Sequence, residues 1–104
     1  MDSLDQEEAE RIYRMAAERT VELGNKLGEA DQDADLWDIA DGLLAGAVHF
    51  WLYSRQPCND PACEDCISIR TAESRLAELR HSIEQAATDS EYFHTPNDLN
   101  AGHA

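Results

Sequence analysis

The chain has 104 residues, of which 42% are hydrophobic and only 7% are aromatic, so a single domain with a mostly aliphatic core is expected. Its 22 acidic and 8 basic residues give a formal net charge of −14 at pH 7. A negative field of this size repels nucleic acid phosphates and anionic lipid and attracts basic surfaces, which argues against direct nucleic acid or membrane binding.

The first segment with a helical pattern is predicted to span residues 4–27. Small or apolar residues recur three or four positions apart along it, and Glu7/Arg11 and Glu10/Arg14 are spaced as i,i+4 pairs on an outer face. Gly24 and Gly28 are interpreted as candidate C-caps of this helix. The acidic start lacks the basic region and apolar core of a signal peptide, so a cytoplasmic location is expected.

An acidic connection, GEADQDAD at residues 28–35, is expected between the first two helices, with Asp33 or Asp35 capping the second. Its D-x-D-x-D spacing resembles the start of a calcium loop. Leu36 and Gly42 stand where such a loop needs glycine and glutamate, so calcium binding is not expected.

The second helix is predicted over residues 36–54. From Gly42 onward it is apolar nearly all round, as in the central helix of a bundle. The apolar run 42–53 is shorter than the ~20 residues needed to cross a membrane. Gly42 and Gly46 permit close approach of another helix, either from the same chain or from a second copy, so a homodimer is one alternative.

A third helix is predicted over residues 69–93, with Ser68 or Thr71 as its cap, and the tail 95–104 is expected to be flexible. Its stripe of apolar residues faces inward, and its outer face is an arginine and glutamate mixture that includes Arg70 and Arg75. The sequence thus predicts one all-α domain over residues 1–94. It should be a compact three-helix bundle with a cysteine-rich loop between the second and third helices.

The loop PCNDPACEDC, residues 57–66, contains all three cysteines in the pattern C-x4-C-x2-C. In a reducing cytosol such a cluster favours metal ligands or reactive thiols over disulfides. Cys58, Cys63 and Cys66 are predicted to bind a structural zinc ion, because zinc takes four tetrahedral ligands from thiolates and histidines. His49 is preferred as the fourth ligand, ahead of His81, which is expected to face solvent. His94 and His103 could reach the loop only if the tail docks.

Three alternatives to zinc remain for this loop. The same spacing occurs in [2Fe–2S] sites that a distant fourth cysteine completes, and because this chain has none, a cluster would need a histidine or an outside ligand. A thiol switch is disfavoured because Asp60, Glu64 and Asp65 should raise the pKa values of the thiols. Ordinary reduced cysteines are the third alternative.

The C-x2-C pair in a helical chain is similar to part of the zinc-containing anti-sigma domains, which bind transcription factors through packed helices. The family motif is H-x3-C-x2-C, and Asn59 stands where its histidine would be. The likeness covers only C-x2-C and helix content, so no family membership follows.

No nucleophile elbow, phosphate loop or basic cleft is found, so an enzyme is not expected. We expect a small acidic protein that regulates or inhibits a basic, nucleic-acid-binding protein, as phage-type anti-restriction or anti-CRISPR inhibitors and transcription-regulator antagonists do. The expected partner-binding residues are Glu7, Glu8, Glu18, Glu22, Asp31, Asp33, Asp35, Asp38 and Asp41. The alternative is a metal- or redox-dependent accessory protein that uses Cys58, Cys63 and Cys66.

Overall fold

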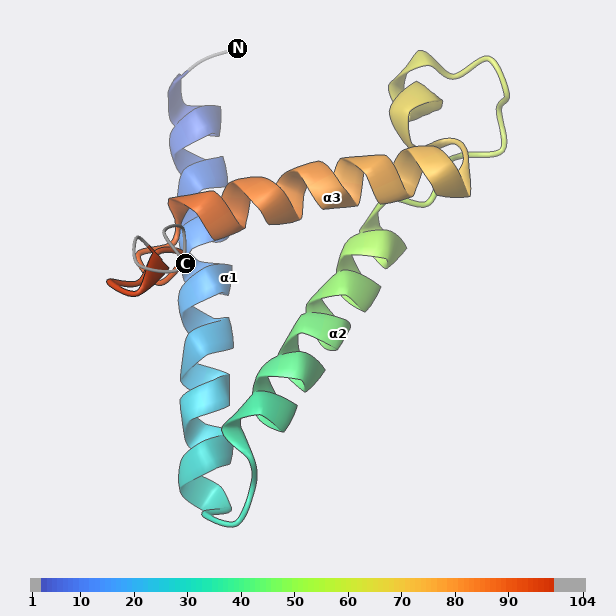
Figure 1. Ribbon diagram of the computed structural model, residues 1–104. Helices are drawn as coiled ribbons and strands as arrows, with labels where there is room; N and C mark the ends of the chain where they lie inside the picture. The colour runs from blue at the N-terminus through green and yellow to red at the C-terminus, as the bar shows by residue number, and fades with distance from the viewer. Residues whose placement is uncertain (1–2, 99–104) are drawn as a thin grey trace. The chain divides into compact units, whose positions relative to one another are not determined.

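The computed structural model describes residues 3–98, with side chains from residue 4 onward. That range is built of α1 (Ser3–Ala30), α2 (Leu36–Ser54), the 3-10 helix η1 (Glu64–Ile69) and α3 (Ala72–Asp89), and it contains no strand (Figure 1). The predicted all-α class is therefore confirmed, as are three long helices with the cysteine loop between the second and the third. Most of the tail, including His103, lies outside the described residues.

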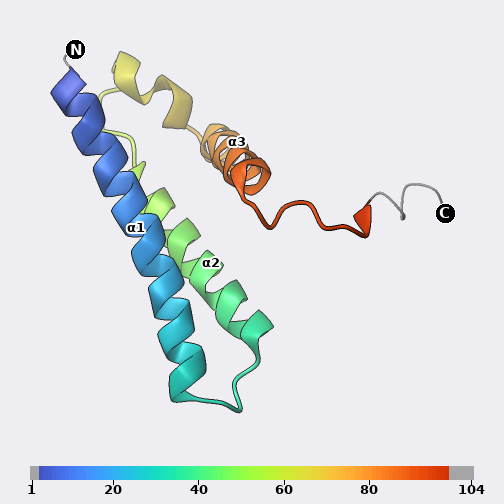
Figure 2. The same cartoon turned by 90° about the vertical axis from the view of Figure 1, so that its left-hand side faces the viewer.

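The chain divides into two compact units, Met1–His49 and Phe50–Ala104. The packing of all three helices into one bundle and one domain stays a prediction. The first unit is a helical hairpin of α1 and most of α2 (Figure 2). Asp35 ends the connection by accepting a hydrogen bond from the Trp37 backbone N–H at 2.9 Å, which confirms it as the cap of the second helix.

Gly24 and Gly28 do not end α1, which continues to Ala30, so their interpretation as C-caps was wrong. A Cβ atom on Gly24 would lie 2.9 Å from Cδ1 of Leu43, and one on Gly28 would lie 3.9 Å from Cδ1 of Ile39. Gly24 therefore lets α2 approach α1 closely near the connecting loop, whereas a side chain at Gly28 would make only an ordinary contact with Ile39.

The bounds of α2 match the prediction at both ends. At its C-terminus, the Ser54 hydroxyl donates to the Trp51 carbonyl at 2.6 Å, and the Gln56 side chain donates to the Leu52 carbonyl at 3.0 Å. These bonds satisfy carbonyls that the helix leaves without partners, and Pro57 cannot continue it. Neither α2 nor any other described helix combines the length and apolar character that a membrane crossing requires.

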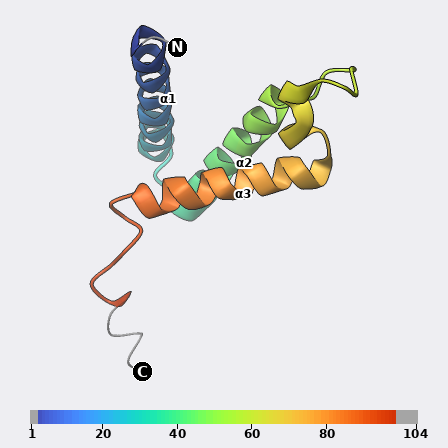
Figure 3. The same ribbon diagram turned by 90° about the horizontal axis from the view of Figure 1, so that it is seen from above.

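The second unit contains the cysteine loop, η1 and α3, with η1 against α3 (Figure 3). α3 begins at Ala72 and ends at Asp89, so it is shorter at both ends than the predicted 69–93. Residues Glu64–Ile69 form η1 instead. Thr71, one of the two predicted caps, caps α3 through a reciprocal capping box with Ser74. At the other end Ser90 adopts an extended conformation, which stops the helix.

Few large apolar side chains are buried in residues 4–98. Leu79, 7% exposed, is the one buried hydrophobic side chain in this range. The exposed large apolar side chains of the first unit are Leu4, Ile12, Tyr13, Met15, Val21, Leu23, Leu27, Leu36, Trp37 and Leu44. Apolar surface on this scale is typical of a protein whose helices contact further protein surface.

Candidate metal centre

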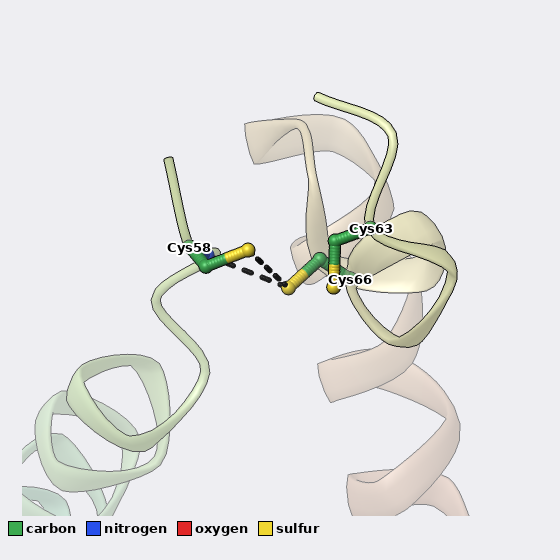
Figure 4. Close-up of side chains that lie close together, drawn as sticks. All are labelled: Cys58, Cys63 and Cys66. Atoms are coloured by element: carbon green, nitrogen blue, oxygen red, sulfur yellow. Dashed lines mark hydrogen bonds between the residues drawn. The ribbon is translucent and has the colours of Figure 1, made fainter. Parts of the chain in front are cut away.

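The three cysteines lie together in the second unit, as the spacing predicted (Figure 4). Cys58 lies on the segment that follows α2, Cys63 immediately precedes η1, and Cys66 lies within it. Their Sγ atoms all lie within 4.8 Å of one another, and those of Cys58 and Cys66 are 3.7 Å apart. All three are free thiols. The group is therefore suited to hold a metal ion.

A tight turn brings the C-x2-C pair to the same side of the loop. Asp60 initiates it: its side chain accepts from the Ala62 backbone N–H at 2.9 Å, and its carbonyl accepts from the Cys63 N–H at 3.1 Å. The Cys66 N–H then donates to the Cys63 carbonyl at 3.3 Å. Asp60 thus shapes the loop through local hydrogen bonds, which is a common use of aspartate in turns.

Two arginines bond backbone carbonyls of this turn and of the end of η1, and the sequence reasoning missed both by assigning them to an outer face. Arg70 is half-buried and donates to the carbonyls of Asp60 at 3.2 Å and Cys63 at 2.7 Å. Arg75 donates to the carbonyls of Ile69 at 2.9 Å and Arg70 at 3.3 Å, at the end of η1. The sequence carried no signal for them, because their spacing is that of the other arginines on the outer face of the third helix.

The sulfur geometry fits a tetrahedral metal. With Zn–S bonds of about 2.3 Å, two sulfurs on one tetrahedral zinc ion lie about 3.8 Å apart. The Cys58–Cys66 separation of 3.7 Å is already close to that value. In addition, the Cys58 backbone N–H donates to Sγ of Cys66 at 3.4 Å, a contact that orients a thiolate ligand.

The thiols do not respond uniformly to their acidic surroundings. The backbone of Asp60, followed by the Cys63 and Cys66 side chains and Arg70, lowers the pKa of Cys58, contrary to the expectation that nearby acids raise it. At Cys66 a hydrogen bond from the Cys58 backbone favours the thiolate. The neighbouring thiols of Cys63 and Cys58 outweigh it, so the pKa of Cys66 is raised. Local hydrogen bonds therefore shift the pKa values of Cys58 and Cys66 in opposite directions, although both were expected to be raised.

No histidine joins the three cysteines in the group that the described residues form. His81 is exposed on α3, as predicted, and His94 lies 3.5 Å from Asp98 in an exposed pair. His49 is exposed and is the last residue of the first unit. Its role as the fourth ligand stays a prediction.

All nine acids predicted to bind a partner are exposed, and all belong to the first unit. Asp31 and Asp35 also accept backbone hydrogen bonds in the connection between α1 and α2, from the N–H groups of Asp33 and Trp37. Glu8 pairs with Arg11, and Glu22 lies 3.9 Å from Arg19. The acids therefore lie apart from the metal centre in sequence and in structural unit.

An apolar ridge on α1 is a second feature that the sequence reasoning missed. It consists of Ala9, Tyr13, Ala17 and Val21, which border shallow depressions together with Glu10, Glu18 and Glu22. Tyr13 is 72% exposed and Val21 63% exposed. The four residues are spaced four apart, and this spacing was the sequence signal from which the ridge could have been predicted.

Residues seven apart lie on the same face of an α-helix, and Ala17 and Val21 of the ridge lie seven residues before Gly24 and Gly28. The ridge is therefore on the face of α1 that contacts α2 nearer the connecting loop. In Figure 1 the two helices diverge away from their connecting loop. Tyr13 and Val21 of the ridge are accordingly largely exposed.

No protein-family model matches the chain, and no match was found among curated proteins or among solved structures.

Proposed function

We propose that the protein is a cytoplasmic binding protein rather than an enzyme, and that it regulates or inhibits a basic protein partner. The observation that carries this proposal is the apolar ridge of α1, uncovered in the hairpin and edged by Glu10, Glu18 and Glu22. A nucleic-acid-binding protein, whose working surface is basic, is the partner class that this charge fits.

The ridge defines the chemistry of its partner. Its apolar side chains, spaced four residues apart on one helix, fit an amphipathic helix that offers apolar anchors at similar spacing. The acidic edge selects basic residues beside those anchors, with Arg14 as the one base bordering the same depression. A second copy of the chain is a poor occupant, because each copy carries a net charge of −14.

The cysteine loop has a supporting role in this proposal. A zinc ion bound there would tie the segment after α2 to the start of η1. Arg70 already bonds the Cys63 carbonyl just before η1, and Arg75 of α3 bonds the Ile69 carbonyl at its end. A small chain gains stability from such a metal, since the free energy of metal binding contributes to folding. The zinc would then stabilise the fold, while the first unit binds the partner.

The test uses a synthetic amphipathic helix of leucine and lysine as the probe. We expect fluorescence anisotropy to show saturable binding that weakens as salt rises from 50 to 300 mM, because screening shortens the range of charge attraction. Neutralising the ridge edge (Glu10→Gln, Glu18→Gln, Glu22→Gln) should weaken binding by about 1.4- to 5-fold per acid, the factor for exposed ion pairs. The matched control removes three acids from α3 (Glu73→Gln, Glu78→Gln, Glu84→Gln) and should bind almost normally.

A Tyr13→Ala variant tests the apolar part of the ridge. We expect about 5- to 30-fold weaker probe binding, the usual cost of truncating an aromatic anchor. Because Tyr13 is 72% exposed, its free energy of unfolding should change by less than about 0.5 kcal/mol.

Three outcomes would contradict the proposed function. They are a large loss of stability in Tyr13→Ala, equal binding of a scrambled peptide of the same charge, and equal effects of the two triple variants. The first would show that the ridge is part of the chain's own core, and the other two that only general charge attracts the probe.

The cysteine cluster favours a second candidate function, a metal- or redox-dependent accessory protein in which the thiols are the working groups. The two functions differ in the behaviour of Cys63→Ser. In the binding protein, this variant loses stability, but its folded fraction keeps its affinity for the probe. In the accessory protein, function is lost while the fold stays intact.

A further inference from the structure

We propose that Cys58, Cys63 and Cys66 hold one Zn²⁺ through three thiolates, and that the fourth position is open to an exchangeable neutral donor from outside the chain, the imidazole of a histidine. This inference concerns the second unit and does not rest on the proposed partner of α1.

The sulfur positions require little movement to bind the ion. The Cys58 and Cys66 sulfurs are 3.7 Å apart, near the edge of a zinc–thiolate tetrahedron, and Cys63 lies within 4.8 Å of both. Arg70 fixes the turn between Cys58 and Cys66 by bonds to two of its carbonyls. The site is thus largely formed before a metal arrives.

The described part of the second unit supplies three donors and no fourth. His81 and His94 are not members of the group, and neither are the carboxylates of Asp60, Glu64 and Asp65. Cys58 is exposed, so the group is accessible to solvent on that side. A zinc ion with three protein ligands and an accessible position exchanges its remaining ligand, as in catalytic zinc sites.

Charge decides which donor is preferred. Binding Zn²⁺ releases three thiol protons, so the filled site carries one net negative charge within a loop that also contains Asp60, Glu64 and Asp65. A fourth thiolate would add a second negative charge, whereas a neutral imidazole or water adds none. Imidazole is also among the ligands that zinc prefers.

The experiment titrates the reduced, chelator-treated protein with Co²⁺ under anaerobic conditions, since Co²⁺ reports coordination by visible absorption. We expect one Co²⁺ per chain, thiolate-to-metal charge-transfer bands, and displacement by one equivalent of Zn²⁺. Free imidazole should then shift the visible bands in a saturable way. A small thiol at the same concentration should bind at least several-fold more weakly.

Variants identify the ligands. Cys63→Ser and Cys58→Ser should each lose the charge-transfer intensity of one thiolate, and circular dichroism of both reports whether the helices are retained. His49→Ala should leave both the Co²⁺ spectrum and the imidazole response unchanged.

Two results would overturn the proposal. If His49→Ala alters the bands and creates an imidazole response that the parent protein lacks, His49 completes a closed site. If no stoichiometric Co²⁺ or Zn²⁺ binds to the folded protein, the three cysteines are ordinary thiols. Because neither result involves the basic probe, failure here is distinguishable from failure of the proposed function.

Discussion

At the scale of single residues, the cysteine loop separates groups that look equivalent in sequence. Cys58 is exposed and the backbone of Asp60 lowers its pKa, while Cys66 is half-buried beside two other thiols that raise its pKa. The first environment favours the thiolate and the second disfavours it. Cys58 is therefore expected to be attacked more readily than Cys66.

Alkylation of the metal-free protein should follow this difference. Because the pKa of Cys58 is lowered and that of Cys66 is raised, Cys58 forms its thiolate at lower pH and should react with iodoacetamide several-fold faster. The preference should shrink as pH rises and Cys66 also ionises. All three cysteines share the tryptic peptide 56–70, so fragmentation mass spectrometry assigns the label. Equal labelling, or Cys66 reacting first, would refute the prediction.

Added zinc is the control for this measurement. If the cluster binds the ion, zinc should protect all three cysteines together, because a coordinated thiolate is a weaker nucleophile than a free one. Protection of Cys58 alone would be inconsistent with a shared site.

At the scale of elements, glycines have different roles in the two helices of the first unit. Gly24 allows α1 to approach Leu43, whereas a Cβ atom on Gly42 or Gly46 of α2 would meet nothing within 4 Å. Glycine in the middle of a helix costs about 0.5 to 1 kcal/mol relative to alanine when no close contact needs it. Alanine substitutions at Gly42 and Gly46, which lie in open space, are therefore matched controls for the same substitution at Gly24.

Gly42→Ala and Gly46→Ala should each raise the free energy of unfolding by about 0.5 to 1 kcal/mol, measured by urea denaturation. Gly24→Ala should gain less or lose stability, since Leu43 must shift to accept the new methyl group. Sedimentation of the same variants tests the homodimer alternative. Loss of both stability and a dimer in the α2 variants would show that these glycines contact a second copy.

Helix bounds were predictable from sequence where they depend on neighbouring residues. The start of α2 at Leu36 follows from the Asp35 cap, and its end at Ser54 from Pro57. The end of α1 was not predictable in the same way, because Gly24 and Gly28 resemble C-caps in sequence although α1 continues through both to Ala30. The start of α3 was predictable in part: Thr71, one of the two caps expected from sequence, is the observed cap, whereas a start at residue 69 was wrong because residues 64–69 form η1.

The same distinction applies to the candidate metal centre. Its three thiols were predictable, since the C-x4-C-x2-C spacing constrains them to one short loop. The support from Arg70 was not, because a sequence pattern cannot distinguish an arginine on a solvent-facing surface from one that binds loop carbonyls. The uncovered ridge of α1 also depends on the divergence of two helices, which periodicity alone does not give.

At the scale of the whole molecule, the net charge of −14 acts on folding and on binding with opposite signs. Within the chain the acids repel one another and destabilise the compact state, while toward a basic partner they attract. Salt weakens both effects, because the screening length falls from about 10 Å at 0.1 M to about 3 Å at 1 M. Stability and affinity should consequently respond to salt in opposite directions.

We expect the melting temperature of the free protein to rise as sodium chloride increases from 0.05 to 0.5 M, while affinity for the leucine and lysine probe falls over the same range. Neutralising three acids of the ridge should reduce both salt dependences, because it removes charges that contribute to repulsion and to attraction alike. The α3 triple variant should reduce only the salt dependence of stability. If the melting temperature is insensitive to salt, the acids are already compensated locally, and the charge of the chain then serves solubility more than association.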